Sequence, residues 1–273
     1  MTFSLVACDL EAGDWGVAVA SKFPSVGAVV PWARGNVGAV ATQSLANVLY
    51  GPEGIERLAS GGSAEQVVAD LTGPDDMREE RQLGVVDGHG GSATFTGGDC
   101  VDWAGGRTGP CYAAQGNILT GPEVVDALVE VFLATQGTLA ERMLAALLAA
   151  DRAGGDRRGR QSAALVIRRE GGGYGGNNDI LLDLRVDDHA DPVPELRRIH
   201  GIHDLLFGKT PADEFVPIEG PLATEMTERL SRIGHASLQE WADIENLEER
   251  LDPSGTTVDP VVLRLLRETT STS

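Results

Sequence analysis

Short apolar segments separated by turn residues make up the first part of the chain. Residues 3–8 and 15–20 are apolar and β-prone, and they flank a turn at 11–14, which predicts a β-hairpin that starts at residue 2 or 3. The Val- and Ala-rich runs 26–30 and 37–42 predict a second pair of strands. Hairpin-type connections between strands build antiparallel sheets.

Helical patterns then alternate with further strands. A short amphipathic segment at 51–60 is the first helix candidate, and three capping boxes predict helix starts at Ser63, Thr120 and Thr138. Asp191 before Pro192 predicts another helix start. Strands are predicted on both sides of the loop 88–91 and at 111–119, 162–168 and 180–186.

This order of elements predicts an α+β fold for residues 1–208. Antiparallel sheets need cover on their apolar faces, and the interspersed helices can supply it. We therefore predict a four-layer αββα sandwich of two antiparallel sheets between helix layers.

Composition changes after residue 208, which predicts a second unit at 209–273. Residues 211–273 contain 13 acidic and 5 basic side chains and show no strand pattern. Helices are predicted at 221–233, 238–250 and 260–268. We expect a small acidic helical domain whose core contains Leu230, Trp241, Leu247 and Leu263.

Charge and cysteine usage narrow the function classes. The net charge of −19 argues against nucleic acid or an anionic membrane as a partner, because both would repel the protein. The N-terminus has no signal-peptide pattern, and no apolar run is long enough for a membrane span. Three cysteines without a C-x-x-C motif fit a reducing compartment, although a bridge between Cys100 and Cys111 stays open. We expect a cytoplasmic protein.

Thr2 is the first candidate for chemistry. Methionine aminopeptidase removes Met1 when the second residue is small, which would leave a hydroxyl and a free α-amine on one residue. An α-amine has a pKa of about 8 and can accept the hydroxyl proton as the oxygen attacks a carbonyl. The alternative is that Thr2 is merely a common second residue.

Ser21 and Lys22 follow the strand that pairs with the one starting at Thr2. Antiparallel pairing brings the end of one strand beside the start of the other, so either side chain is expected near the Thr2 amine. An ammonium there would lower the pKa of the amine, and a hydroxyl would relay its proton. The alternative for Lys22 is an ordinary surface lysine.

Asn117 and Gln43 each end an apolar strand. The Gly116–Asn117 pair can offer a backbone N–H and a side-chain amide to a developing oxyanion, and Gln43 is a similar candidate for substrate binding. The alternative, which the residues alone favour, is a simple turn before the next helix.

A basic loop at 154–162 precedes the strand 162–168. Asp156, Arg160, Gln161 and Ser162 are candidates there for binding the substrate, since arginine binds carboxylates bidentately. Arg–Asp pairing that fixes the loop is the alternative, and both can hold. The acidic run 187–191 fits no zinc or calcium spacing, so we assign no metal and no cofactor.

Six stretches in order carry a family resemblance: "TFSLVACDLEAGDWGVAVASKFPSVGAVVPWA", "GAVATQSLAN", "RQLGVVD", "AAQGNIL", "GGDRRGRQSAAL" and "LDLRVDDHADPVPELRRI". Residues 2 to about 207 resemble a bacterial family of unknown function in the Ntn (N-terminal nucleophile) hydrolase superfamily. The resemblance implies the αββα sandwich and Thr2 as nucleophile. It also implies a tuning role near Ser21 and Lys22 and an oxyanion role for Asn117.

The resemblance supplies no substrate beyond the amides that the superfamily hydrolyses. The tail is similar to a small domain assigned to peptidoglycan binding, so a peptidoglycan fragment is a second candidate ligand. We expect the tail to pack on the core or on a partner subunit of a homo-oligomer. The first functional hypothesis is therefore an amidohydrolase for a small amide. The alternative is a non-catalytic binding or assembly protein that retains the fold.

Overall fold

The computed structural model describes residues 2–271. Its contacts divide the chain into two units, Met1–Arg197 and Arg198–Ser273. The division falls within helix α5 (Pro192–Phe207), whereas the change in composition suggested a boundary at its end. The second half of α5 belongs to the second unit because Leu206 packs in that unit's core and Arg250 donates to the carbonyls of Asp204 and Leu205.

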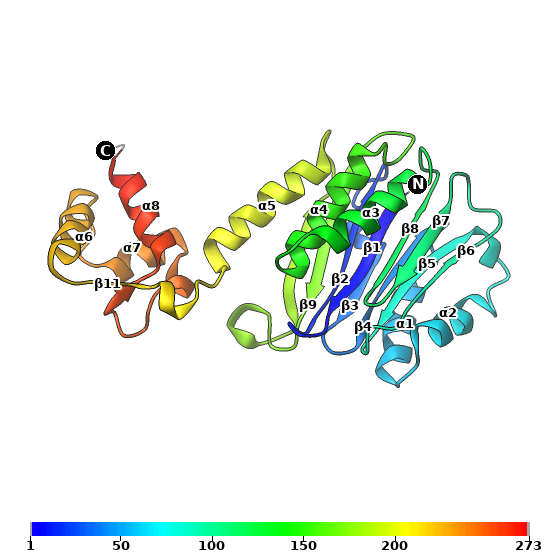
Figure 1. The fold of residues 1–273 in the computed structure, drawn as a ribbon, viewed down its shortest axis with the longest axis horizontal. Helices are drawn as coiled ribbons and strands as arrows, with labels where there is room; N and C mark the ends of the chain where they lie inside the picture. The colour runs from blue at the N-terminus through cyan, green and yellow to red at the C-terminus, as the bar shows by residue number, and fades with distance from the viewer. Residues whose placement is uncertain (1, 272–273) are drawn as a thin grey trace. The chain divides into compact units, whose positions relative to one another are not determined.

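Two antiparallel sheets form the first unit (Figure 1). The larger sheet has six strands in the order β10-β9-β2-β1-β8-β7, and the smaller has four in the order β3-β4-β5-β6. β1 therefore lies in the middle of the larger sheet, as the sequence predicted. The strands are β1 (Thr2–Asp9), β2 (Asp14–Ser21), β3 (Pro31–Arg34), β4 (Gly38–Ser44), β5 (Arg81–Asp87), β6 (Ser92–Thr96), β7 (Gly105–Gly109), β8 (Tyr112–Asn117), β9 (Ser162–Arg168) and β10 (Ile180–Val186).

Apolar side chains fill the space between the sheets. Val6, Val17 and Val19 of the larger sheet pack with Ala39 and Val86 of the smaller one. The helices α3 (Glu123–Ala134) and α4 (Leu139–Arg152) contact the larger sheet, and α1 (Tyr50–Ala59) and α2 (Ala64–Thr72) contact the smaller one (Figure 1). The molecule is thus α+β with antiparallel sheets, and its relation to the Ntn sandwich stays a prediction.

Two local predictions were wrong because of tertiary hydrogen bonds, and one strand was not predicted. Residues 26–28 form a 3₁₀ turn instead of a strand, because the Val26 N–H donates to Ser162 Oγ. The Thr120 capping box is not used, since Thr120 N–H donates to Gly155 O and α3 begins at Glu123. β7 was missed because its sequence, GGRTG, has no apolar alternation. The boxes at Ser63 and Thr138 are confirmed.

The second unit is mainly helical and has its own core. Its elements are α6 (Gly220–Arg232), α7 (Leu238–Glu245) and α8 (Pro260–Ser271), with a pairing of β11 (Val216–Pro217) and β12 (Thr257–Val258) that the sequence did not predict. The four predicted core residues, Leu230, Trp241, Leu247 and Leu263, are all buried in one cluster. All three cysteines of the chain are free thiols.

A buried ion pair between Arg250 and Asp259 lies just before α8, and Arg250 also donates to two carbonyls at the end of α5. Arg250 Nη1 donates to Asp259 Oδ2 at 2.8 Å, and the two side chains are 5% and 1% exposed. We predict that Asp259→Ala lowers the free energy of unfolding of the second unit by about 3 kcal/mol or more, because it leaves the buried guanidinium of Arg250 without a counter-charge. Hydrogen exchange should speed up across residues 204–271, while the exposed control Asp213→Ala should leave it unchanged. Unchanged hydrogen exchange in Asp259→Ala would show that this ion pair does not stabilise the second unit.

Candidate functional site

Thr2 begins the central strand β1, between the last residues of its two neighbouring strands. Thr2 lies opposite Asn117 of β8, and the pairing of Phe3 with Ala20 puts Ser21 of β2 on its other side. Thr2 Oγ1 and Ser21 Oγ are 3.1 Å apart. Directly opposite residues share a face of the sheet, so the register brings three candidate side chains together.

Gln82 is the centre of a buried polar network beside Thr2, between the two sheets. Its Nε2 donates to Gly116 O at 2.7 Å, and its Oε1 accepts from Gln43 Nε2 at 2.7 Å and from Asn117 Nδ2 at 2.9 Å. Gln43 Nε2 also donates to Thr2 O at 3.3 Å. The network therefore ties the start of β1 to both sheets.

Ser4 and Gln115 extend this network along β1. Gln115 Nε2 donates to Ser4 Oγ, and Ser4 Oγ donates to Gln43 Oε1, both at 2.7 Å. Gly84 of the facing sheet makes room for Gln115, since a Cβ at position 84 would collide with the Gln115 amide. A glycine at this point is what lets an amide side chain cross between two packed sheets.

The backbone fixes the direction of the amides. A carbonyl only accepts, so Gln82 must turn its nitrogen toward Gly116 O and its oxygen toward Asn117. Asn117 must then present its nitrogen to Gln82. Its Oδ1 is left buried without a partner. Asn117 thus offers, beside Thr2, one unpaired acceptor and the second hydrogen of its amide nitrogen.

Asp156 holds the loop 154–160 against the strand ends on both sides of Thr2. Its side chain is 2% exposed, and its carboxylate accepts from Lys22 N at 2.7 Å and from Arg158 N at 2.8 Å. The Asp156 backbone bridges to Leu119, just beyond β8. The loop therefore spans the gap between the ends of β2 and β8, where β1 starts.

The three arginines of this loop differ in their partners. Arg160 Nε donates to Asp151 Oδ1 at 2.7 Å, which raises the pKa of Arg160, and Arg160 also pairs with Asp191. Arg158 pairs with Asp156. Among residues 2–271, no carboxylate pairs with Arg157, although its N–H donates to Ile118 O at 3.3 Å.

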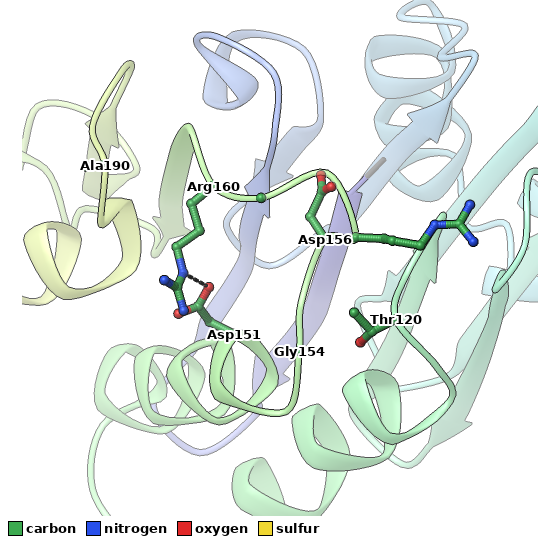
Figure 2. Close-up of a pocket in the computed structure, with 8 residues that line it drawn as sticks. Thr120, Asp151, Gly154, Asp156, Arg160 and Ala190 are labelled. Atoms are coloured by element: carbon green, nitrogen blue, oxygen red, sulfur yellow. Dashed lines mark hydrogen bonds and ion pairs between the residues drawn. The ribbon is translucent and has the colours of Figure 1, made fainter.

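A polar cavity of about 360 Å³ opens beside this loop (Figure 2). Figure 2 shows the Arg160–Asp151 pair on one side of it and Thr120 on the other, with Asp156 between. A much smaller cavity shares Asp151, Asp156, Gly159 and Arg160 with it and reaches Phe3, Ala20 and Ser21. Thr2 lines neither cavity and is 6% exposed. The lining residues of the larger cavity are Thr120, Asp151, Gly154, Asp156, Arg157, Gly159, Arg160 and Ala190.

The remaining sequence candidates lie at this end of the sheet but outside the cavities. The Lys22 side chain is exposed, and it is the Lys22 backbone that contacts Asp156. Gln161 Nε2 donates to Asp188 Oδ1, while Ser162 Oγ bonds Phe23 O and Val26 N. These contacts fix the loops around β2.

Sequence reasoning missed Gln82 and Asp151. An uncharged polar residue directly before the apolar run 83–86 of β5 was a signal for Gln82. Asp151 ends an ordinary amphipathic helix and gave none. Within the part of the chain that the structure describes, no group of three or more His, Cys, Asp or Glu side chains is arranged to hold a metal. No described helix is long and apolar enough to cross a membrane.

Comparisons with known proteins identify the family. Residues 2–196 match the family of unknown function DUF1028, and the chain belongs to this family. A crystal structure of a DUF1028 protein from Silicibacter pomeroyi is similar, with a TM-score of 0.68 and 31% identity over 81% of this chain and 88% of the other. No curated protein matches the chain.

We predict that Asp156→Ala lowers the free energy of unfolding by about 3 kcal/mol, because the N–H groups of Lys22 and Arg158 lose a charged acceptor. Urea unfolding followed by circular dichroism measures the change. Asp76→Ala, at an exposed aspartate of the same unit, should stay within about 0.5 kcal/mol of the parent chain. Equal stabilities for the two variants would contradict a structural role for Asp156.

We also predict that Gln82→Met, which has a similar volume, destabilises the first unit. It leaves Asn117 Nδ2 and Gly116 O without their partner, at about 1–3 kcal/mol for each buried group. The thermal unfolding midpoint is the measurement, with Gln136→Met as an exposed control. A midpoint for Gln82→Met equal to that of the control would show that the network contributes no stability.

Proposed function

We propose that this member of the DUF1028 family is an N-terminal-threonine amidohydrolase that cleaves a small amide. The observation that carries the proposal is the position of Thr2 at the start of the central strand, with its hydroxyl 3.1 Å from that of Ser21. The two face-to-face antiparallel sheets with helices on their outer sides support placing the family in the Ntn-hydrolase superfamily.

The reaction requires that Met1 be removed, so that Thr2 carries a free α-amine. In the proposed step Thr2 Oγ1 attacks the amide carbon and passes its proton to the amine, directly or through the Ser21 hydroxyl. The C–N bond then breaks, the leaving amine takes that proton, and an ester on Thr2 remains. Water hydrolyses this ester and restores the hydroxyl.

Asn117 is the proposed group for binding both charges that develop. Its second amide hydrogen is available to the oxyanion, whereas Gln43 Nε2 already donates both hydrogens, to Gln82 and to Thr2 O. The unpaired Asn117 Oδ1 is an acceptor suited to the α-ammonium of Thr2, which lies directly opposite in the register. In this proposal Lys22 acts through its backbone, and Ser21 is the group that tunes the amine.

One observation favours the alternative of a non-catalytic binding or assembly protein. Thr2 is 6% exposed and Asn117 only 1%, so substrate access to both requires movement of the residues around the start of β1. The two functions differ in one requirement, because only the hydrolase needs a free Thr2 amine.

We predict that intact mass measurement will show loss of Met1, and that a β-lactone electrophile will add once, at Thr2. Thr2→Val keeps the shape of the side chain without the hydroxyl and should lose both the adduct and any release of amine from a panel of N-acyl amino acids. Thr2→Ser should retain both. Retention of Met1, or an adduct that persists in Thr2→Val, would contradict the proposal of an N-terminal-threonine hydrolase.

A further inference from the structure

We propose that Arg157 binds a carboxylate of the ligand in the cavity beside the loop 154–160. This inference rests on the proposed function for the identity of the reaction, since it adds the substrate class: a small amide that carries a carboxylate. The site itself is argued from charge and geometry independent of catalysis.

Of the arginines in the loop 154–160, Arg157 is the one that forms no ion pair among the described residues. Asp151 is engaged by Arg160 at 2.7 Å and Asp156 by Arg158 at 3.3 Å, so both buried carboxylates have a partner. Arg157 lines the same cavity, is exposed, and has no carboxylate partner among the described residues. In a chain with a net charge of −19, a guanidinium without a carboxylate partner, on a residue that lines a cavity, is a local site for an anion.

The backbone of Arg157 is anchored next to the proposed reaction centre. Its N–H donates to Ile118 O at 3.3 Å, and Ile118 directly follows Asn117, the residue opposite Thr2. This hydrogen bond fixes the position of the Arg157 backbone, from which the long side chain extends. An anion bound there would lie close to the ends of β2 and β8.

The surroundings favour a carboxylate over a phosphate. The cavity wall already contains the carboxylates of Asp151 and Asp156, which disfavour a second negative charge on the ligand. A guanidinium matches a planar carboxylate with two parallel hydrogen bonds. The Thr120 hydroxyl lines the same cavity and can donate to the same group. A volume of about 360 Å³ suits a small molecule.

The sequence analysis named Arg160 as the candidate for binding the substrate, whereas the ion pairs in the structure favour Arg157. Arg160 is held between Asp151 and Asp191, so its charge is already used within the loop. Arg160 therefore shapes the cavity wall, and the specificity-determining residue is Arg157.

The test compares two probes that differ only in the carboxylate, N-acetylglycine and N-acetylglycinamide. Binding to the full chain is measured by calorimetry at fixed ionic strength, in the parent protein and in Thr2→Val, which cannot turn the probe over. We expect the acid to bind about tenfold more tightly than the amide, and the preference to fall as salt is added. Arg157→Gln should abolish the preference.

Arg152→Gln is the matched control, because it removes the same charge from the exposed end of α4 without touching the cavity. The preference should survive in that variant. Loss of the preference in both variants, its survival in Arg157→Gln, or no binding of the acid would overturn the proposal. Inorganic phosphate that displaces the acid from the site would overturn the choice of a carboxylate.

Failure of this proposal and failure of the proposed function are distinguishable. Arg157-dependent binding without any turnover or Thr2 adduct would leave a carboxylate-binding protein and remove the hydrolase. A Thr2 adduct with equal binding of both probes would leave the hydrolase and remove the carboxylate site.

Discussion

The buried carboxylate of Asp156 determines how the candidate site is assembled. A carboxylate that is 2% exposed must find donors, and it finds them in the N–H of Lys22 and in the backbone and guanidinium of Arg158. Since the Asp156 backbone also bridges to Leu119, one residue joins the chain after β2 to the chain after β8. The start of β1 and both cavities are arranged around this connection.

The polar network between the sheets is the second constraint. Apolar side chains such as Val6 and Val17 pack over most of the space between the two sheets. At the end near Thr2 the filling is instead amides and hydroxyls, which is tolerable only because nearly all of them are hydrogen-bonded. The exceptions, Gln115 Oε1 and Asn117 Oδ1, are acceptors with no donor. Of these two acceptors, Asn117 Oδ1 belongs to the residue directly opposite Thr2, and it is the one used in the proposed function.

Charge is arranged differently on the two sides of this end of the sheet. Between the sheets the network is neutral, with Gln82, Gln43 and Asn117 as its main members. At the loop, Arg158 and Arg160 form ion pairs with Asp156, Asp151 and Asp191, and Arg157 has no carboxylate partner among the described residues. A neutral, desolvated environment favours the uncharged form of an amine, whereas a guanidinium without a carboxylate partner attracts an anion. The proposed nucleophile and the proposed carboxylate site therefore lie in two different electrostatic environments.

Elements with strong local signals could be predicted from the sequence alone. Short apolar, β-prone runs located β1, β2, β9 and β10, and the capping boxes at Ser63 and Thr138 set two helix starts, because these signals depend only on neighbours in the chain. The sequence also indicated Thr2 and Ser21, since hairpin order pairs β1 with β2, and it indicated Asn117 from the Gly–Asn pair at a strand end.

Tertiary structure decided everything that depends on residues distant in the chain. The turn at Val26 and the unused cap at Thr120 result from hydrogen bonds to Ser162 and Gly155, which no local pattern reports. The same holds for Gln82 as the network centre and for the ion pairs of Arg158 and Arg160, which leave Arg157 without a carboxylate partner among the described residues. Which arginine of a basic loop forms no ion pair depends on which carboxylates the fold brings against the others, and pairing of that kind is set only when the strands and helices have packed.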